Sequence, residues 1–445
     1  MPEIASPPAS TLTPAKTARQ RTDTFTSIWM IIAVAMALVT LVVKNRMPQP
    51  LWTIIHLVTL GVLTNGIFQW SWFFARSLAR LSADDPRARR HNTIRILIFN
   101  ACFLLLFVSM WLGWMVGTMI AATGIAAVAA WHGAEMLSVL RERLASRFVI
   151  VVRYYVCSAS FFVLAALLAS FVSATMFSPS IPEAMVAMRD RLTLAHALSG
   201  VAGWVGLTIG GTVITLGPTI LRTRMSPDAV SGGVRVLLPW CLSLLLAIAG
   251  ALLGVMPLVG AGILAVGTCA IVGIVYPYAK VLRNKGPREY SAWSFLLGLL
   301  WISVGVCALG VASLFVSTPS QLRALTLMWL PIIGIAGFAQ LFQGALSYLM
   351  PVVIGGGPSV VRIGIAIIDW QYSLRLGLRN SALILELFLF FTSDSPSVHV
   401  LRMAGWFLVI ATFVIDVVIY AKTGVTQARA RRARSETLSE SRQVQ

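Results

Sequence analysis

The sequence predicts an all-α integral membrane protein with about twelve transmembrane helices. Hydrophobic residues make up 58% of the 445-residue chain and charged residues only 11%. Water-soluble proteins of this length do not have such a composition. Apolar stretches alternate with basic loops, and most stretches approach the roughly 20 residues that a helix needs to cross a hydrocarbon core. Helices are expected rather than strands because lipid offers the backbone no hydrogen-bond partner.

The expected crossings define a single polytopic domain over residues 25–421. In chain order they cover residues 25–43, 51–78, 96–115, 117–139, 149–176, 193–221, 232–255, 257–281, 293–315, 325–353, 378–392 and 398–421. Residues 1–24 are expected to form a disordered cytoplasmic segment. The first crossing lacks a small-residue cleavage site, which favours a retained signal anchor. Residues 422–445 are polar and arginine-rich, and we expect a disordered cytoplasmic tail.

Basic residues predict the orientation of the chain. Lys and Arg outnumber Asp and Glu by 35 to 16, and they gather in every second connection and in both terminal segments. Those connections and termini hold 27 Lys and Arg residues, against five in the others. The positive-inside rule places the basic side, and both termini, in the cytoplasm of a cell-membrane protein. The charge is therefore interpreted as an orientation signal rather than a nucleic-acid surface.

One connection differs from the others. It opens with Gly355–Pro358, a helix-breaking turn, and continues as a mixture of apolar and charged residues. This pattern predicts an amphipathic helix at about 360–378 that lies on the cytoplasmic interface. The glycines lack the Lys-Ser/Thr that a phosphate-binding loop needs.

A weak internal repeat relates crossings two, six and ten. His56 and His196 occupy comparable places near the outer ends of crossings two and six, and Ala336 holds the same place in crossing ten. The spacing predicts three four-helix units. Internal repeats recur among transporters, so a repeat alone does not select a function.

Histidines are the strongest candidates for chemistry. His56, His196 and His399 are all expected near the extracytoplasmic face, whereas His91 and His132 lie toward the cytoplasmic side. Neutral imidazole binds haem iron and copper. One interpretation is a haem or copper site built by His56 and His196, with His399 as a third candidate ligand. The alternative is that these are ordinary interfacial histidines that hydrogen-bond water.

Intramembrane charges form a second group of candidates, because such charges are costly in lipid. Glu386 and Arg402 fall at nearly the same depth in crossings eleven and twelve, and we expect a structural ion pair, with a proton relay as the alternative. Asp416 and Glu135 lie near cytoplasmic helix ends, where water or arginine can reach them. The five cysteines all fall inside apolar segments and predict packing rather than disulfides or a zinc site.

Several stretches resemble a polytopic actinobacterial membrane family that occurs alone or fused to multicopper-oxidase or copper nitrite-reductase-like domains. The stretches are residues 196–198, 203–208 and 217–225, His56 with Leu57, Leu60, Gly61 and Asn65, and residues 343–351 with the turn at 355–358. That family is distantly similar to haem–copper membrane proteins of nitric-oxide response and to oxidase subunit I. The resemblance implies haem or copper, and a copper or haem redox partner protein.

The sequence departs from the haem–copper oxidases at their metal ligands. It has no His-His pair and no His-x-His motif, because Leu198 stands where a second histidine would complete the latter. A binuclear oxygen-reducing centre is therefore not expected. Three functions remain open: a redox-associated membrane protein, a secondary transporter, and a non-catalytic scaffold or accessory subunit of a redox complex. No nucleotide-binding or hydrolase motif appears in a suitable context.

Overall fold

The computed structural model describes residues 14–43, 49–82, 84–144, 149–177, 182–224, 227–284, 286–393 and 395–443. Within these ranges the secondary structure consists of 13 helices, several of them joined from α- and π-helical segments, and it includes no strand. Ten of the helices are long and apolar enough to cross a membrane. The chain is a multi-pass membrane protein, and a lipid bilayer is its solvent.

The ten candidate spans coincide with ten of the twelve expected crossings. The two remaining crossings are helices of a different kind. The described apolar part of α1 (Pro14–Val43) covers only Phe25–Thr40. Helix α16 (Tyr372–Phe390) carries two arginines and a glutamate among its buried residues. Twelve crossings therefore remain a prediction.

The chain forms two compact units, and the single polytopic domain over residues 25–421 stays a prediction. The first comprises Met1–Val213 and Leu244–Val259, and the second Ile214–Ser243 and Gly260–Gln445. The boundaries fall inside three helices, which are α8 (Leu207–Ile220), α9 (Pro227–Leu253) and α10 (Met256–Ala270).

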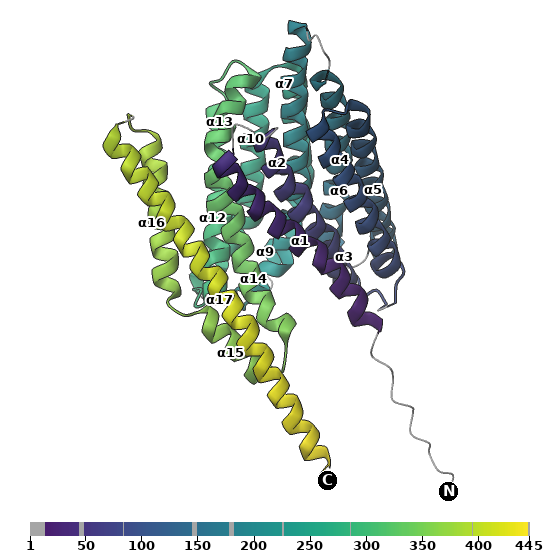
Figure 1. Ribbon diagram of the computed structural model, residues 1–445, viewed down its shortest axis with the longest axis vertical. Coiled ribbons are helices and arrows are strands. Elements are labelled where there is room, and N and C mark those ends of the chain that lie inside the picture. Colours follow the sequence, from purple (N-terminus) through teal and green to yellow (C-terminus); the bar gives the residue numbers. More distant parts are fainter. Residues whose placement is uncertain are drawn as a thin grey trace. The chain divides into compact units, whose positions relative to one another are not determined.

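The first unit is built around an aromatic core. Its remaining elements are α2 (Pro50–His56), η2 (Leu57–Thr64), α3 (Asn65–Leu78), η3 (Arg87–His91), α4 (Asn92–Leu112), α5 (Met115–Glu142), α6 (Val149–Met176), α7 (Glu183–Ala197) and η4 (Leu198–Gly206). Helices α4, α5 and α6 run side by side (Figure 1). Phe68, Phe99, Trp72 and Trp204 are fully buried between these helices.

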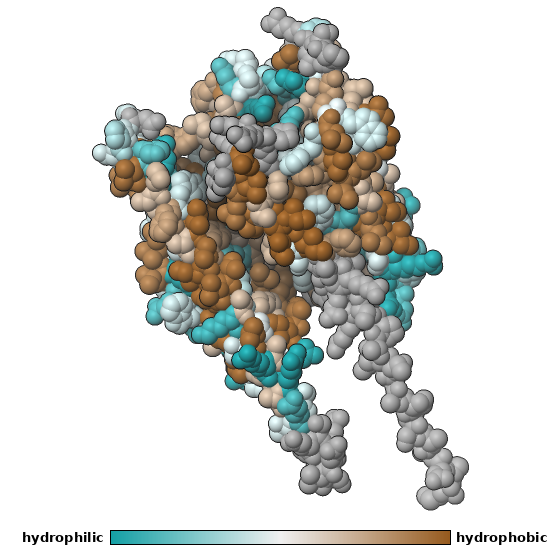
Figure 2. Space-filling model, in the orientation of Figure 1, coloured by the Kyte–Doolittle hydropathy of each residue, from teal (hydrophilic) through white to brown (hydrophobic). Residues whose placement is uncertain are grey.

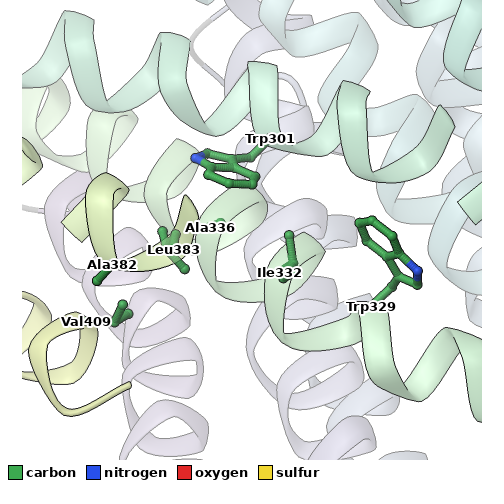
Figure 3. Packing of buried hydrophobic residues seen from close by; sticks show 7 residues of the cluster. All are labelled: Trp301, Trp329, Ile332, Ala336, Ala382, Leu383 and Val409. Atoms are coloured by element: carbon green, nitrogen blue, oxygen red, sulfur yellow. The ribbon is translucent and has the colours of Figure 1, made fainter. Parts of the chain in front are cut away.

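In the second unit, the last two helices of the chain form a hairpin that packs against a core of tryptophan and aliphatic residues. Its elements are η5 (Ile271–Val275), α11 (Tyr276–Asn284), α12 (Tyr290–Ser313), α13 (Pro319–Pro331), η6 (Ile332–Ala339), α14 (Gln340–Ile354), α15 (Pro358–Ile368), α16 and α17 (Pro396–Gln443). Figure 3 shows Trp301 and Trp329 beside Ile332, with Leu383 of α16 and Val409 of α17 in the same cluster. Helix α17 packs against both α15 and α16.

Apolar side chains face outward as well as inward, as lipid permits. Hydrophobic residues dominate the face drawn in Figure 2, and hydrophilic residues concentrate toward helix ends. Phe171, Leu238 and Phe407 are each more than 60% exposed. Such side chains lose little by exposure to lipid tails, which are as apolar as they are.

Three expectations at the chain's polar segments need correction. The amphipathic helix ends at Ile368, because Gln371 takes a left-handed conformation (φ 49°) and residues 372–378 begin α16. The tail beyond residue 421 continues α17 as far as Gln443. Arg431 supports this extension by donating to the Ile354 carbonyl at 2.8 Å. At the other end, residues 14–24 are helical within α1, whereas residues 1–13 lie outside the described ranges.

Long π-helical stretches interrupt crossings two, six and ten. They are η2, η4 and η6, with eight, nine and eight residues. The π-helix is rare, and even its single-turn form is frequent at functional sites. These stretches shift the side-chain register of the residues that follow, so they influence which groups face the interior.

Candidate functional site

The structure brings His56 and His196 together. His56 is the last residue of α2, directly before η2, and His196 lies in the last turn of α7, directly before η4. Their rings lie 6.1 Å apart between centroids, and their planes differ by only 10°. Two histidines 140 residues apart in the sequence are thus neighbours at matching places on two helices.

Both imidazoles are fixed through the same ring nitrogen. Nδ1 of His56 lies 2.9 Å from the Trp52 carbonyl oxygen, and Nδ1 of His196 lies 2.8 Å from that of Ala165. A carbonyl oxygen only accepts, so Nδ1 carries the hydrogen in each ring. A neutral ring in this state has its lone pair on Nε2. Metal-binding histidines commonly have this arrangement, with the second nitrogen held by a carbonyl or carboxylate.

Neighbouring side chains restrict the pair further. The Trp52 ring stacks on His56 with centroids 4.3 Å apart. Eight residues deeper on both helices, Trp204 donates its indole N–H to Thr64 Oγ1 at 3.0 Å. Thr64 and Trp204 are also 140 residues apart, so two successive contacts join equivalent positions of crossings two and six.

The pair supplies two nitrogen ligands. Among the described residues, no group of three or more His, Cys, Asp or Glu side chains is arranged to hold a metal ion. His399 lies near the start of α17 in the second unit, and its participation stays a prediction. Two imidazole nitrogens are fewer than the four ligands that a closed structural metal site usually takes.

His132 has a different environment from the pair. Its ring is fully buried and lies 4.9 Å from the Phe68 ring and 6.1 Å from the Trp204 ring, between centroids. Nε2 is 3.4 Å from Ser71 Oγ, and Nδ1 has no hydrogen-bond partner among the described residues. This histidine therefore belongs to the aromatic core of the first unit.

A network of charged side chains lies at the ends of α4 and α5. Glu135 pairs with the buried Arg95 and accepts from His91 Nδ1 at 2.7 Å, so the expected arginine partner of Glu135 is present. Nearby, Arg87 bridges Asp85 and Glu142. The hydrogen bond from Arg87 lowers the pKa of Asp85, which keeps this carboxylate ionised. These contacts fasten the connection between α3 and α4 to α5.

Asp416, like Glu135, has an arginine partner as expected, and two arginines of α16 form a buried charge cluster with it. Arg375 and Arg379 of α16 both pair with Asp416 of α17, and all three side chains are at most 5% exposed. Tyr290 of α12 donates to Asp416 Oδ2 at 2.6 Å, and Arg379 donates to Gln343 Oε1 at 2.7 Å. Both arginines were expected to be orientation charges in a connection between crossings. The cluster could have been predicted from the i, i+4 spacing of the two arginines, together with an aspartate in the following crossing.

Glu386 and Arg402 lie on the facing helices α16 and α17, as expected. The Glu386 carboxylate packs against Gly405, three residues beyond Arg402. Arg402 donates to the Leu389 carbonyl at 3.0 Å. Their ion pair stays a prediction.

No protein-family model matches the chain, and no curated protein matches it. The function is therefore inferred from the geometry of these side chains.

Proposed function

We propose that this chain is a redox-associated protein of the cell membrane that holds haem or copper through His56 and His196. The observation that carries the proposal is the parallel pair of imidazoles 6.1 Å apart, each with Nδ1 on a backbone carbonyl. With Nδ1 on a carbonyl, each ring has its lone pair on Nε2, the nitrogen that would act as a ligand.

The chemistry of the donor set would suit either group, because haem iron and copper both accept imidazole nitrogen, and His56 and His196 would hold it. When bound, either group supplies one-electron transfer. The carbonyls of Trp52 and Ala165 set the tautomer of the two rings, and the Trp52 ring limits rotation of His56. A copper or haem redox protein is the corresponding partner.

An absorption spectrum and an elemental analysis of the purified full-length protein test this proposal. We expect a haem Soret band or about one copper per chain, because a preformed pair of ligands binds with little ordering cost. His56→Ala and His196→Ala should each lower the bound haem or copper by at least about tenfold. Removing a residue that hydrogen-bonds to a metal ligand already lowers metal affinity by about 10–100-fold, and removing the ligand itself should cost more.

Two further variants complete the experiment. His91→Ala is the matched control, because His91 pairs with Glu135 away from the proposed ligands. His399→Ala tests the third candidate. A wild-type protein with neither haem nor copper after expression with both supplied would contradict the proposal.

We also infer twelve crossings in three four-helix units, with both termini in the cytoplasm. Helices α1 and α16 supply the two crossings beyond the ten long apolar spans. The similar lengths of η2, η4 and η6, at corresponding places in crossings two, six and ten, support the repeat. The charge asymmetry of the connections supports the orientation.

A secondary transporter is the second candidate. The buried cluster of Arg375, Arg379 and Asp416 favours it, because ionisable groups inside membrane helices often mark substrate or ion pathways.

A further inference from the structure

The junction between α15 and the end of α17 has an excess of positive charge. Residues 290–368 and 417–435 contain no Asp or Glu, and these two stretches include all of α14 and α15 and the arginine-rich part of α17. The acidic residues that border them are Asp369 at the C-terminal end of α15, Asp416 in its buried cluster, and Glu436 after the last arginine. Six basic side chains of α15 and of this part of α17 are exposed, and we call them the α15–α17 basic surface: Arg362, Lys422, Arg429, Arg431, Arg432 and Arg434. This surface presents one sign of charge to a ligand.

Hydrogen bonds hold two of these arginines against the turn between α14 and α15. Arg431 donates to the Ile354 carbonyl at 2.8 Å. Arg434 donates from Nη1 to the Gly356 carbonyl at 3.0 Å and to Ser359 Oγ at 2.7 Å. Both bonds of Arg434 use one nitrogen of a guanidinium that has five N–H groups, so Nε and Nη2 are left for another acceptor.

The turn that these arginines contact lies where a candidate membrane span ends. Val353, next to last in the span Pro319–Ile354, is more than half exposed, as a side chain that faces lipid tails is expected to be. The Ile354 carbonyl that accepts from Arg431 follows it directly. Trp370, just beyond α15, is also more than half exposed, and tryptophan is enriched at membrane–water interfaces. The α15–α17 basic surface is therefore at the level of the lipid headgroups.

Helix α15 has a buried face and an exposed face. Its buried residues are Val360, Gly364 and Ile368, and the helix packs against α17 (Figure 1). The exposed face is formed by residues at i, i+3, i+4 and i+7, which are Ser359, Arg362, Ile363 and Ala366. Polar groups thus begin this face and apolar groups continue it. A phospholipid has the same order, because its polar headgroup is followed by apolar chains.

Two guanidinium groups lie beside Ser359. Arg434 bonds to its hydroxyl directly, and Arg362 lies one helical turn further along the same exposed face. A guanidinium can bind a phosphate through two parallel N–H groups, and these bonds are stronger than bonds between neutral groups. The Ser359 hydroxyl can donate to the same phosphate while it accepts from Arg434. The three side chains therefore offer hydrogen-bond donors for a phosphate group.

We propose that the α15–α17 basic surface binds an anionic phospholipid. The headgroup phosphate is held by Arg362, Ser359 and Arg434, and one acyl chain lies along the apolar part of the exposed face of α15. An anionic lipid is favoured over a zwitterionic one, because basic clusters beside a membrane helix attract net negative charge, whereas a zwitterionic headgroup brings a cation of its own. The bound lipid links α15 to the end of α17 at the same place as the hydrogen bond from Arg434 to Ser359. The site is independent of the proposed histidine ligands.

Native mass spectrometry of the full-length protein tests this site. The protein is released from micelles that contain equal amounts of phosphatidylglycerol and phosphatidylcholine with identical acyl chains, and the retained lipid is identified. We expect a preference for phosphatidylglycerol of about 25-fold, because each of the two arginines at the phosphate contributes about fivefold. The preference should fall as the ionic strength rises, since salt screens exposed charges. Equal retention of the two lipids would overturn the proposal.

Substitutions of the exposed Arg362 test the site without disturbing the core. Arg362→Gln should lower the preference about fivefold, because one of the two charges at the phosphate is lost, whereas Arg362→Lys should keep most of it. Unchanged retention of phosphatidylcholine reports an intact fold in both variants. Arg323→Gln, at an exposed position of α13, is the matched control and should behave as the wild type. An equal loss in Arg323→Gln would overturn the site, because the preference would then follow the charge of the whole chain.

A competition experiment identifies the source of the phosphate. Inorganic phosphate and glycerol 3-phosphate carry the same acceptor group as the lipid, but neither has an acyl chain. Added in millimolar excess, they should leave the retained phosphatidylglycerol in place, because only the lipid also contacts the apolar part of the exposed face of α15. Displacement of the lipid by either compound, with the same dependence on Arg362, would overturn the lipid as the ligand and indicate a site for free phosphate.

Discussion

Several buried or half-buried polar side chains in this protein are held by partners that lie far away in the sequence. His196 bonds to a carbonyl of α6, and Trp204 bonds to Thr64 of η2. Each such group would be costly in an apolar interior if it lost its partner. Their positions are therefore fixed more tightly than apolar packing alone would fix them. This matters for the His56 and His196 rings, which we propose to bind one group together.

The bond between Thr64 and Trp204 can be tested by Thr64→Val, which keeps the shape of the side chain. The indole N–H of Trp204 would lose its acceptor in a buried site, and we expect a loss of about 1–3 kcal/mol in unfolding free energy. Denaturant unfolding in detergent measures the change. Thr326→Val is the control, because the Thr326 hydroxyl bonds only within its own helix, and an equal loss there would contradict the assignment.

At the scale of elements, glycines let α12 and α14 approach closely. A Cβ on Gly344 would lie 2.4 Å from the Phe295 backbone nitrogen, and one on Gly298 would lie 2.4 Å from that of Leu341. The two contacts are reciprocal, one glycine from each helix. Small residues at helix contacts are a common means of association in membranes, where the hydrophobic effect does not hold helices together.

Gly344→Ala should therefore destabilise the second unit. The added methyl meets backbone atoms, which cannot rotate away, so the helices must separate, and we expect a cost of about 1–3 kcal/mol. The matched control is Gly334→Ala, because a Cβ there has open space around it. Thermal unfolding in detergent compares the two, and equal midpoints would show that the close contact of α12 and α14 is dispensable.

At the scale of the whole molecule, the arrangement across the membrane rests on charge. The basic connections alternate with connections that are nearly free of Lys and Arg. Moving many arginines across a bilayer is unfavourable, so one orientation is strongly preferred. The arginines at the end of α17 belong to a helix rather than to the disordered tail that we expected, and they add to the charge of the side that we propose to be cytoplasmic.

Fusions of alkaline phosphatase after Arg89 and after Ser317 test this orientation, because the enzyme is active only outside the cytoplasm. The fusion after Ser317 should be highly active and the fusion after Arg89 nearly inactive, with at least about a tenfold difference, since basic residues beside the membrane-spanning segments favour the cytoplasmic side. Fusions of a fluorescent protein at the same positions should give the opposite pattern. Activity after Arg89 would reverse the proposed sidedness.

The sequence by itself determined the solvent of this protein, the ten long spans and the positions of the candidate histidines. These properties follow from local composition, because the length of an apolar run and the charge beside it are local quantities. It also placed His56 and His196 at matching heights, from their spacing alone.

Only the tertiary structure decided which side chains meet. Arg375 and Arg379 looked like loop charges in the sequence, and they are buried because Asp416 lies opposite them on another helix. The tail looked disordered, and it is helical because Arg431 and Gln427 find carbonyl groups near the Gly355 turn. The physical reason is the same in both cases. The free energy of a buried polar group depends on its partner, and the partner is set by packing between distant segments.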